Sequence, residues 1–471
     1  MIKFKKIAMA LTVMACFAQP ALADEHTDLL DILLQKGILS KQEHASKIKA
    51  YEEVLENKKF SQSRIDKDIR DNNNSRIAKV NDGAVLENGL GFKSKDGANV
   101  IQLTGRLHTD YRSYTPTYSS GQTTDPYQDG IENRRARFGV RGQFQKDFKF
   151  LLLANFGNDV GASSTTSTID EFWVNYAANP QLQVTMGQFK MPFSLEQLTS
   201  SNNIDFMERS LIGQTEGEFI PAKETGFMVH GIPRAGLTWA VAASRGRANK
   251  STAVDSTDLI GRATVNFAEI VQNKDYVAHL GLGYSTGTIK TGVTPASGRT
   301  EGRASSAFFT GPALSGDTER TRQGIEAAFA WKGIKLQGEK FNFKYDPTTG
   351  SNQEIQGHYA QAVYNLTGES HAYKDGSFGW IKPNSPFTAN GGLGAWQVGV
   401  RASEFDADGI TVVAGKTTKA TSLTYGLTWF ANDNVRVMLN YVDTKFGAPV
   451  GTAGSRVDGE KVVMLRGQLS F

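Results

Sequence analysis

The strongest constraint on this chain is a two-residue alternation of apolar and polar side chains, which recurs over residues 99–471 in segments of about ten residues. In the first segment Ile101, Leu103 and Leu107 share one side with Gly105, and the residues on the other side are polar or charged. The segment that ends at Phe471 alternates in the same way. Since successive side chains of a strand point to opposite faces, each segment predicts a β-strand with one apolar and one polar face.

The connections between these segments alternate in length. Short connections include 179–181, 331–333 and 431–434, and long ones include 113–130, 191–223 and 287–319. Short turns at one end and long loops at the other are typical of outer-membrane barrels, which must close because lipid cannot satisfy a free sheet edge. We therefore expect an all-β fold over residues 97–471: a transmembrane antiparallel β-barrel of about 16 strands. The alternative is a soluble β-sandwich, which is disfavoured because its strands are usually shorter.

Residues 1–23 have the pattern of a signal peptide. Basic residues begin the segment, an apolar run over 7–18 follows, and Ala21-Leu22-Ala23 predicts cleavage after Ala23. The apolar run is too short for a membrane-spanning helix. Lipoprotein processing at Cys16 is a second alternative with a looser match. Export together with a barrel predicts the outer membrane of a Gram-negative bacterium.

Residues 24–96 predict a periplasmic helical stalk and a linker. Gly37 is placed to end a first helix, and Ser40 with Glu43 fits a capping box at the start of a second. Apolar residues at a and d positions of one heptad frame, from Ile48 to Ile69, indicate a short coiled coil. The alternative is a solvated amphipathic helix that packs on a neighbouring domain.

Composition and motifs narrow the classes of function. A single cysteine excludes a disulfide scaffold, and no nucleotide loop, zinc spacing or calcium loop occurs, so we expect no cofactor and no metal. The formal net charge of +4 includes three lysines in residues 1–23, so the exported chain is nearly neutral and nucleic acid is not an expected partner. None of the seven histidines lies in a motif with a nucleophile, so we expect no catalytic residue and no enzyme activity.

Several motifs occur in an order that resembles the phosphate-selective porin O and P family. They are Leu33–Ser40 (LLQKGILS), Arg134–Val140 (RRARFGV), Gly187–Ser194 (GQFKMPFS), Met207–Ser210 (MERS) and Tyr364–Glu369 (YNLTGE). The resemblance implies a trimeric porin in the outer-membrane lipid, with a long third loop folded into the lumen. It also implies passage of small anions, in some members with a preference for phosphate or polyphosphate.

Arginine suits this chemistry because its planar group stays charged and donates two parallel hydrogen bonds to an oxyanion. Strand parity places Arg135, Arg137 and Arg141 on the lumen face, whereas Arg134 falls on the lipid face as an outlier. The candidate pore-lining and anion-binding residues are Arg106, Arg112, Arg135, Arg137, Arg141, Lys190, Arg209, Arg262, Arg320 and Arg322. The alternative is that lumen carboxylates neutralise them; Asp110, Glu132, Asp258 and Glu326 share the lumen parity.

The predicted constriction loop, 191–223, is acidic. It carries five acidic residues, Glu196, Asp205, Glu208, Glu216 and Glu218, against the two cations Arg209 and Lys223. The stretch Ser200-Ser201-Asn202-Asn203 lacks the lysines that phosphate-specific family members carry there. The inward arginines and the resemblance predict an anion-leaning porin for passive diffusion of small solutes, with phosphate or other oxyanions as candidates. The acidic loop leaves the solute and the pore size open. The alternatives are a non-selective porin whose stalk tethers the envelope and an outer-membrane hydrolase.

Overall fold

The computed structural model describes residues 90–157, 168–214, 219–246, 257–290, 297–303, 307–312 and 315–471, with pieces of the N-terminal segment (32, 34–37, 40–50, 52–53, 56 and 84–86). The signal peptide and most of the heptad positions lie outside the described residues. The capping box is confirmed, because the Ser40 N–H donates to Glu43 Oε2 over 3.0 Å and the Glu43 N–H donates to Ser40 Oγ over 3.3 Å. Among the described residues, no helix combines the length and hydropathy required to cross a bilayer.

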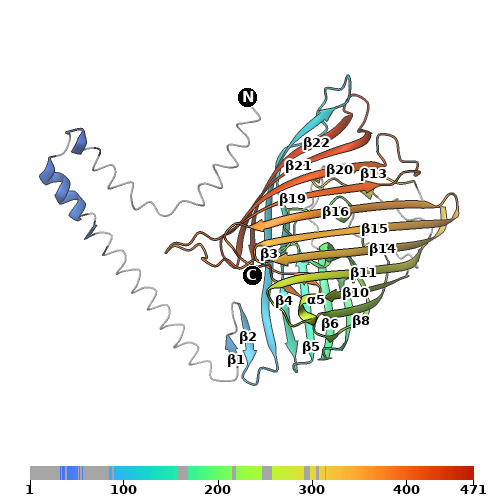
Figure 1. The fold of residues 1–471 in the computed structure, drawn as a ribbon, viewed down its shortest axis with the longest axis horizontal. Helices are drawn as coiled ribbons and strands as arrows, with labels where there is room; N and C mark the ends of the chain where they lie inside the picture. The colour runs from blue at the N-terminus through green and yellow to red at the C-terminus, as the bar shows by residue number, and fades with distance from the viewer. Residues whose placement is uncertain are drawn as a thin grey trace.

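In the described part of the chain, sixteen antiparallel strands close into a barrel (Figure 1), as the alternation predicts. They are β3 (Val100–Tyr118), β4 (Gly130–Phe144), β5 (Phe148–Asn155), β6 (Thr168–Asn179), β7 (Leu182–Lys190), β8 (Lys223–Arg234), β9 (Leu237–Ser244), β10 (Thr257–Asn266), β11 (Tyr276–Ile289), β14 (Ser315–Trp331), β15 (Ile334–Thr349), β16 (Gln353–Asn365), β19 (Ala395–Asp406), β20 (Lys419–Phe430), β21 (Val435–Val450) and β22 (Val457–Ser470). The last strand, β22, pairs with β3 and closes the barrel, so neither strand presents a free edge to lipid.

Several short strands and helices lie outside the sixteen barrel strands. The hairpin β1 (Ala84–Leu86) and β2 (Gly91–Ser94) pairs with the start of β3. The other elements are β12 (Ser297–Gly298), β13 (Phe309–Thr310), β17 (Tyr373–Lys374), β18 (Ser377–Phe378), α4 (Leu195–Leu198), α5 (Phe267–Ile270) and the 3-10 helix η1 (Ile212–Gln214).

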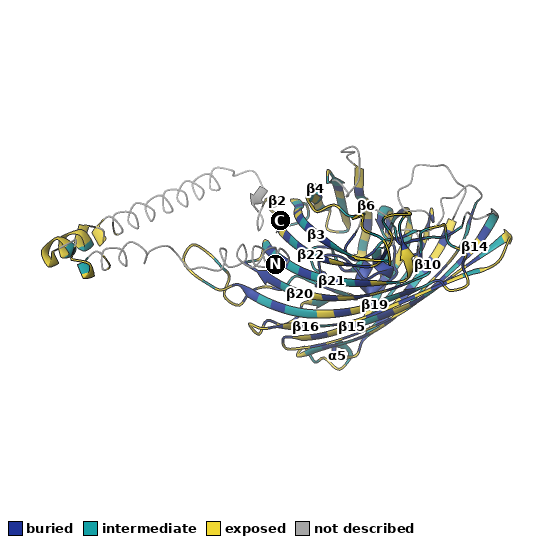
Figure 2. Ribbon diagram, turned by 90° about the horizontal axis from the view of Figure 1, so that it is seen from above, coloured by how far each residue is buried: buried dark blue, intermediate teal, exposed yellow. Residues whose placement is uncertain are grey.

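The outward face of the barrel is apolar where the sequence predicts it. Leu107 and Phe138 are about half exposed, at 48% and 49%, although both are large and hydrophobic. Buried and exposed residues alternate along the strands in Figure 2. Exposed apolar side chains on a closed barrel are expected where hydrocarbon, and not water, surrounds the wall.

At the end of the barrel that carries the short turns, one long connection departs from the length pattern. Residues 366–394 join β16 to β19 at the end of the barrel that otherwise carries short turns, and this long segment includes the β17–β18 hairpin. Its residue Phe378 is buried against Leu195 of α4 and Val277 of β11. The segment folds inward because it carries its own apolar side chains, which the short turns lack.

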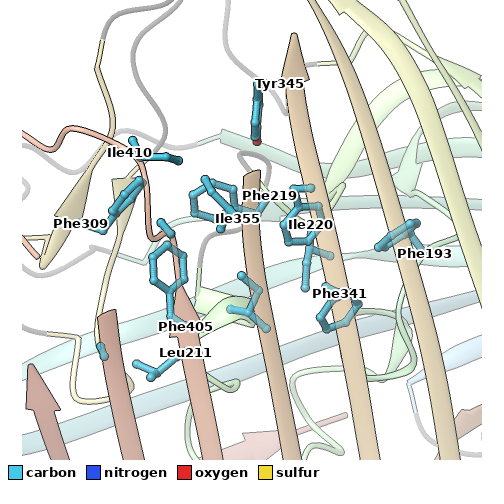
Figure 3. Packing of buried hydrophobic residues seen from close by; sticks show 14 of the residues in the cluster. Phe193, Leu211, Phe219, Ile220, Phe309, Phe341, Tyr345, Ile355, Phe405 and Ile410 are labelled. Carbon is cyan, nitrogen blue, oxygen red and sulfur yellow. The ribbon is translucent and has the colours of Figure 1, made fainter. Parts of the chain in front are cut away.

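A large apolar cluster fills one side of the lumen (Figure 3). Phe219 and Phe309 from the loops pack on Phe405 of β19, with ring centroids 5.7 Å and 5.0 Å apart. Phe341 and Phe343 of β15 point inward and join the same cluster. The wall of β10–β20 therefore holds the inserted loops by hydrophobic packing, and the opening lies on the other side, along β3–β7.

Candidate functional site

The loop 191–222 lies inside the barrel and is anchored at both ends of its short helix α4. The backbone N–H groups of Leu195 and Glu196 donate to the carboxylate of Glu339 over 2.9 Å and 2.7 Å. Lys190 Nζ donates to three carbonyl oxygens at the other end, those of Gln197, Leu198 and Thr199. Both contacts satisfy backbone groups that a helix end leaves without a partner inside the helix.

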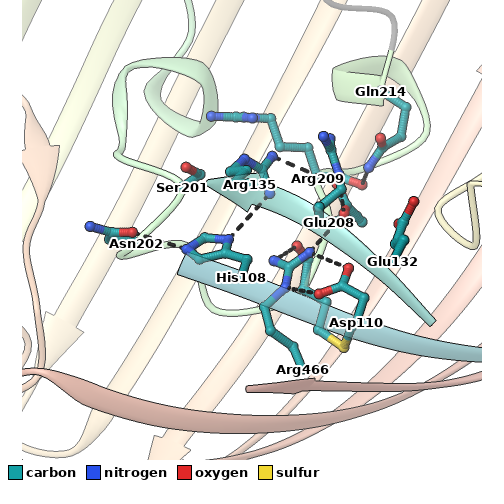
Figure 4. A network of polar contacts seen from close by, with 12 residues as sticks. His108, Asp110, Glu132, Arg135, Ser201, Asn202, Glu208, Arg209, Gln214 and Arg466 are labelled. Atoms are coloured by element: carbon teal, nitrogen blue, oxygen red, sulfur yellow. Dashed lines mark hydrogen bonds and ion pairs between the residues drawn. The ribbon is translucent and has the colours of Figure 1, made fainter. Parts of the chain in front are cut away.

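A buried ion network holds the tip of the loop against β3, β4 and β22 (Figure 4). The carboxylate of Glu208 lies 2.9 Å from Arg466, 3.0 Å from Arg134 and 3.1 Å from Arg112. Burial alone would raise the pKa of Glu208, but the guanidinium groups of Arg134, Arg135 and Arg466 lower it well below its ordinary value. Glu208 therefore stays charged and binds the loop to the wall.

A β-bulge explains the outlier Arg134. The register between β3 and β4 shifts after His108, which faces Arg135, so that Thr109 faces Asn133 and Arg134 is the extra residue. A bulge of this kind re-aims a side chain. Arg134 thus points into the lumen and contacts Glu208, which corrects the lipid-facing position that simple parity assigned to it.

Several of the predicted cations are neutralised by buried carboxylates. Arg320 and Arg322 both pair with Asp258, and Arg262 lies 2.5 Å from Glu326. Arg112 pairs with Asp110 and Glu132 as well as with Glu208. The mutual neutralisation that we considered as an alternative therefore applies to Arg112, Arg262, Arg320 and Arg322.

Three further candidates contact protein groups next to the opening. Lys190 donates hydrogen bonds to carbonyl oxygens at the end of α4. Arg209 donates to the carbonyl oxygens of Glu196, Gln197 and Thr199. Arg135 is buried, with Nη1 3.5 Å from His108 Nδ1. These three residues line the opening and also support the loop.

The opening is a cavity of about 580 Å³ between the loop and strands β3–β7. Among the described residues that line it, eight are cationic and one, Glu171, is acidic. Arg106 donates to Ser201 Oγ over 2.9 Å, and Arg137 lies 2.9 Å from Asp170. Positive charge is thus concentrated on one side of the lumen.

Two lining cations differ from the rest. Arg141 and Lys149 are exposed, and neither forms an ion pair with any residue that the structure describes. Lys149 was missed by the sequence analysis because β5, which reads FKFLLLAN, is apolar at most positions of both faces. Its partner strand β4 alternates clearly, so the register between the two strands shows which residues of β5 face the lumen.

The three described acidic residues of the loop are not among the residues that line the cavity, and their closest ion-pair partners lie outside that lining. Glu196 lies 3.2 Å from Arg401 and Asp205 lies 2.7 Å from Lys335, while Glu208 joins the network described above. Glu216 and Glu218 lie outside the described residues. The acidic composition of the loop is therefore compensated by the barrel wall wherever the structure describes it.

In the part of the chain that the structure describes, no group of three or more His, Cys, Asp or Glu side chains is arranged to hold a metal ion. The buried carboxylates of Asp258, Asp205 and Glu339 instead contact arginine, lysine and backbone donors respectively.

Comparisons with known proteins agree with this architecture. A family model described as phosphate-selective porin O and P matches residues 101–471. Porin O of Pseudomonas aeruginosa is 25% identical over 388 residues, which cover 76% of this chain and 85% of that protein. The outer membrane channel DcaP of Acinetobacter baumannii has a TM-score of 0.51 at 13% identity, over 81% of this chain and all of the other. An anion-selective porin from Comamonas acidovorans has a TM-score of 0.51 at 14% identity, over 79% of this chain and all of the other.

The two solved structures establish the fold, and the family match establishes the kind of protein. A family of porins and a closed barrel indicate a channel of the outer membrane and not an enzyme. This chain belongs to the phosphate-selective porin O and P family.

Proposed function

We propose that this porin carries small anions, phosphate among them, by passive diffusion through the cavity between loop 191–222 and strands β3–β7. The observation that carries the proposal is the lining of that cavity, with eight cations and a single acidic residue among the described residues. A pore selects ions by replacing part of their hydration with fixed charges and dipoles. Clustering matters because salt screens isolated charges over about 8 Å at physiological ionic strength.

Arg141 and Lys149 are the cations that we expect to act most directly on a passing anion. Both are exposed to the cavity, and neither has a carboxylate partner in the described structure. Arg106 and Arg137 are the next candidates, since both line the same cavity. Arg112, Arg262, Arg320 and Arg322 have a structural role in this proposal.

The assembly and processing of the protein are also proposed. Removal of residues 1–23 would release the exported chain, and residues 24–96 would supply a periplasmic helical stalk and a linker that ends in the β1–β2 hairpin. The barrel would assemble as a homotrimer in outer-membrane lipid. The support for this part is the signal pattern and the family resemblance.

Reversal potentials in a potassium chloride gradient test the proposal. We expect the purified porin in a planar bilayer to favour chloride, and the double variant Arg141→Gln with Lys149→Gln to lose part of that preference. Lys344→Gln is the matched control, because this exposed lysine lies on the outward face of β15. Cation preference in the unchanged protein would refute the anion assignment. Equal permeability of both ions would favour the non-selective porin.

A further inference from the structure

The cavity carries an apolar wall beside its cations. Along one register row, Gln102 of β3 faces Arg141 of β4, Arg141 faces Leu151 of β5, and Leu151 faces Trp173 of β6. All four residues line the cavity. A cation, an aliphatic side chain and an indole therefore lie on three neighbouring strands at about 4.8 Å spacing.

The neighbours of this row leave part of the indole accessible, while Trp173 also packs against the large apolar cluster of the lumen. Trp173 faces Gly187 of β7, which has no side chain to cover the ring. Gly187 has a φ of +121°, and a Cβ there would lie 2.2 Å from the carbonyl oxygen of Phe172, so only glycine fits. Trp173 is half-buried and lines the cavity, which keeps part of its surface available to a solute.

A second cation lies next to Leu151 along β5. Lys149 is two residues from Leu151 on the same face of that strand, so Leu151 has Arg141 beside it on β4 and Lys149 beside it on β5. Both cations are exposed and have no ion pair among the described residues. The site combines unpaired positive charge with apolar surface within the reach of a small molecule.

A bare oxyanion does not use such a wall. Phosphate and chloride have no apolar surface to bury, so Leu151 and Trp173 contribute nothing to their binding. An aromatic carboxylate uses both parts, because its carboxylate accepts the paired hydrogen bonds of Arg141 and its ring is removed from water against Leu151 and Trp173. Small sites for organic ligands combine apolar walls with a few placed polar groups in this way.

We propose that this row is a binding site for amphiphilic organic anions, with aromatic monocarboxylates as the preferred class of solute. The inference rests on the proposed anion passage and names its substrate class. The ring contact distinguishes an aromatic carboxylate from an aliphatic one of the same charge, and Arg141 and Lys149 distinguish anions from neutral aromatic molecules.

The test compares benzoate with acetate as blockers of the chloride current through the full-length porin in planar bilayers. We expect benzoate to halve the current at a concentration about tenfold lower than acetate, which corresponds to about 1.4 kcal/mol from ring burial. Trp173→Ala is expected to bring the two anions within about twofold of each other, while Arg141→Gln weakens block by both. Tyr176→Ala is the matched control, since this aromatic residue of β6 faces outward.

Equal block by benzoate and acetate in the unchanged porin would overturn the inference, and so would benzoate preference that survives Trp173→Ala. Leu151→Asn provides a second variant of the apolar wall if Trp173→Ala does not assemble. The reversal potential separates this result from the broader proposal. Anion preference without benzoate preference refutes only the aromatic site, whereas cation preference refutes the anion passage itself.

Discussion

Arg106 of β3 and Arg137 of β4 lie directly opposite each other, and both line the open cavity. Like charges placed opposite on neighbouring strands repel each other. Ser200 and Ser201 accept hydrogen bonds from Arg106, and Asp170 pairs with Arg137, but each arginine keeps a buried Nε without a partner in the described structure. An anion between them would relieve this repulsion.

We predict that Arg106→Gln lowers the permeability of chloride relative to potassium without destabilising the barrel. Glutamine is shorter than arginine and loses the hydrogen bonds to Ser200 and Ser201, but the removal of one of two opposed charges offsets this loss, so the change in unfolding free energy should be within about 1 kcal/mol. Reversal potentials and thermal unfolding in detergent measure the two effects. An unchanged reversal potential would exclude Arg106 from the anion path.

The ion pairs on the far wall should affect stability instead. We predict that Asp258→Asn destabilises the barrel by about 3–5 kcal/mol, because it leaves the buried Arg320 and Arg322 without their shared carboxylate. Thermal unfolding is the measurement. Asp275→Asn, at an exposed residue before β11, is the control and should be neutral. A barrel that tolerates Asp258→Asn equally well would show that these pairs are not required.

The Glu208 network predicts how the channel responds to acid. Its lowered pKa means that the stabilisation is present above the ordinary glutamate value of about 4.3 and is lost as the pH falls through the lowered value. Open-channel current should therefore be steady from pH 7 to about 4.5 and become noisy only at lower pH. Glu208→Gln should produce such noise already at pH 7. Steady current from this variant would show that the network does not hold the loop.

The seam between β22 and β3 ends in a contact between Gly105 and Phe471. Gly105 and Phe471 exchange two backbone hydrogen bonds, and a Cβ at Gly105 would lie 2.5 Å from Phe471 Cζ. We predict that Gly105→Val displaces this ring and destabilises the barrel by about 1–3 kcal/mol. Unfolding of the refolded barrel in detergent measures the effect. Gly467→Ala, at a strand position with no atom within 4 Å of the added Cβ, should change little.

The sequence predicted the barrel because its signal belongs to single strands. The alternation around Ile101 and Leu103 is visible without any partner strand, and it matches the outward faces in the structure. The capping box of Ser40 and Glu43 is equally local. Closure then follows, because an open sheet edge has no stable place in lipid.

Alternation alone does not show which face of a strand is apolar when the surroundings of that face change along the strand. In β15, Ile334 and Leu336 point outward, but beyond Gly338 the apolar residues Phe341 and Phe343 point inward and Lys344 points outward. The parity is unbroken throughout the strand. What changes is the surroundings, since this part of the lumen holds packed loops. No periodicity reveals which environment a face meets.

By itself, the sequence determined that this protein is a closed barrel with arginines on its inner face, because the two-residue period is a property of each strand alone. Only the tertiary structure decided which of those arginines are open to a solute. Arg320 meets Asp258 across 62 residues and Arg401 meets Glu196 across 205, and these pairings depend on strand register and on the inserted loop. Arg141 and Lys149 were left unpaired by the same packing, because no described carboxylate is brought within reach of them.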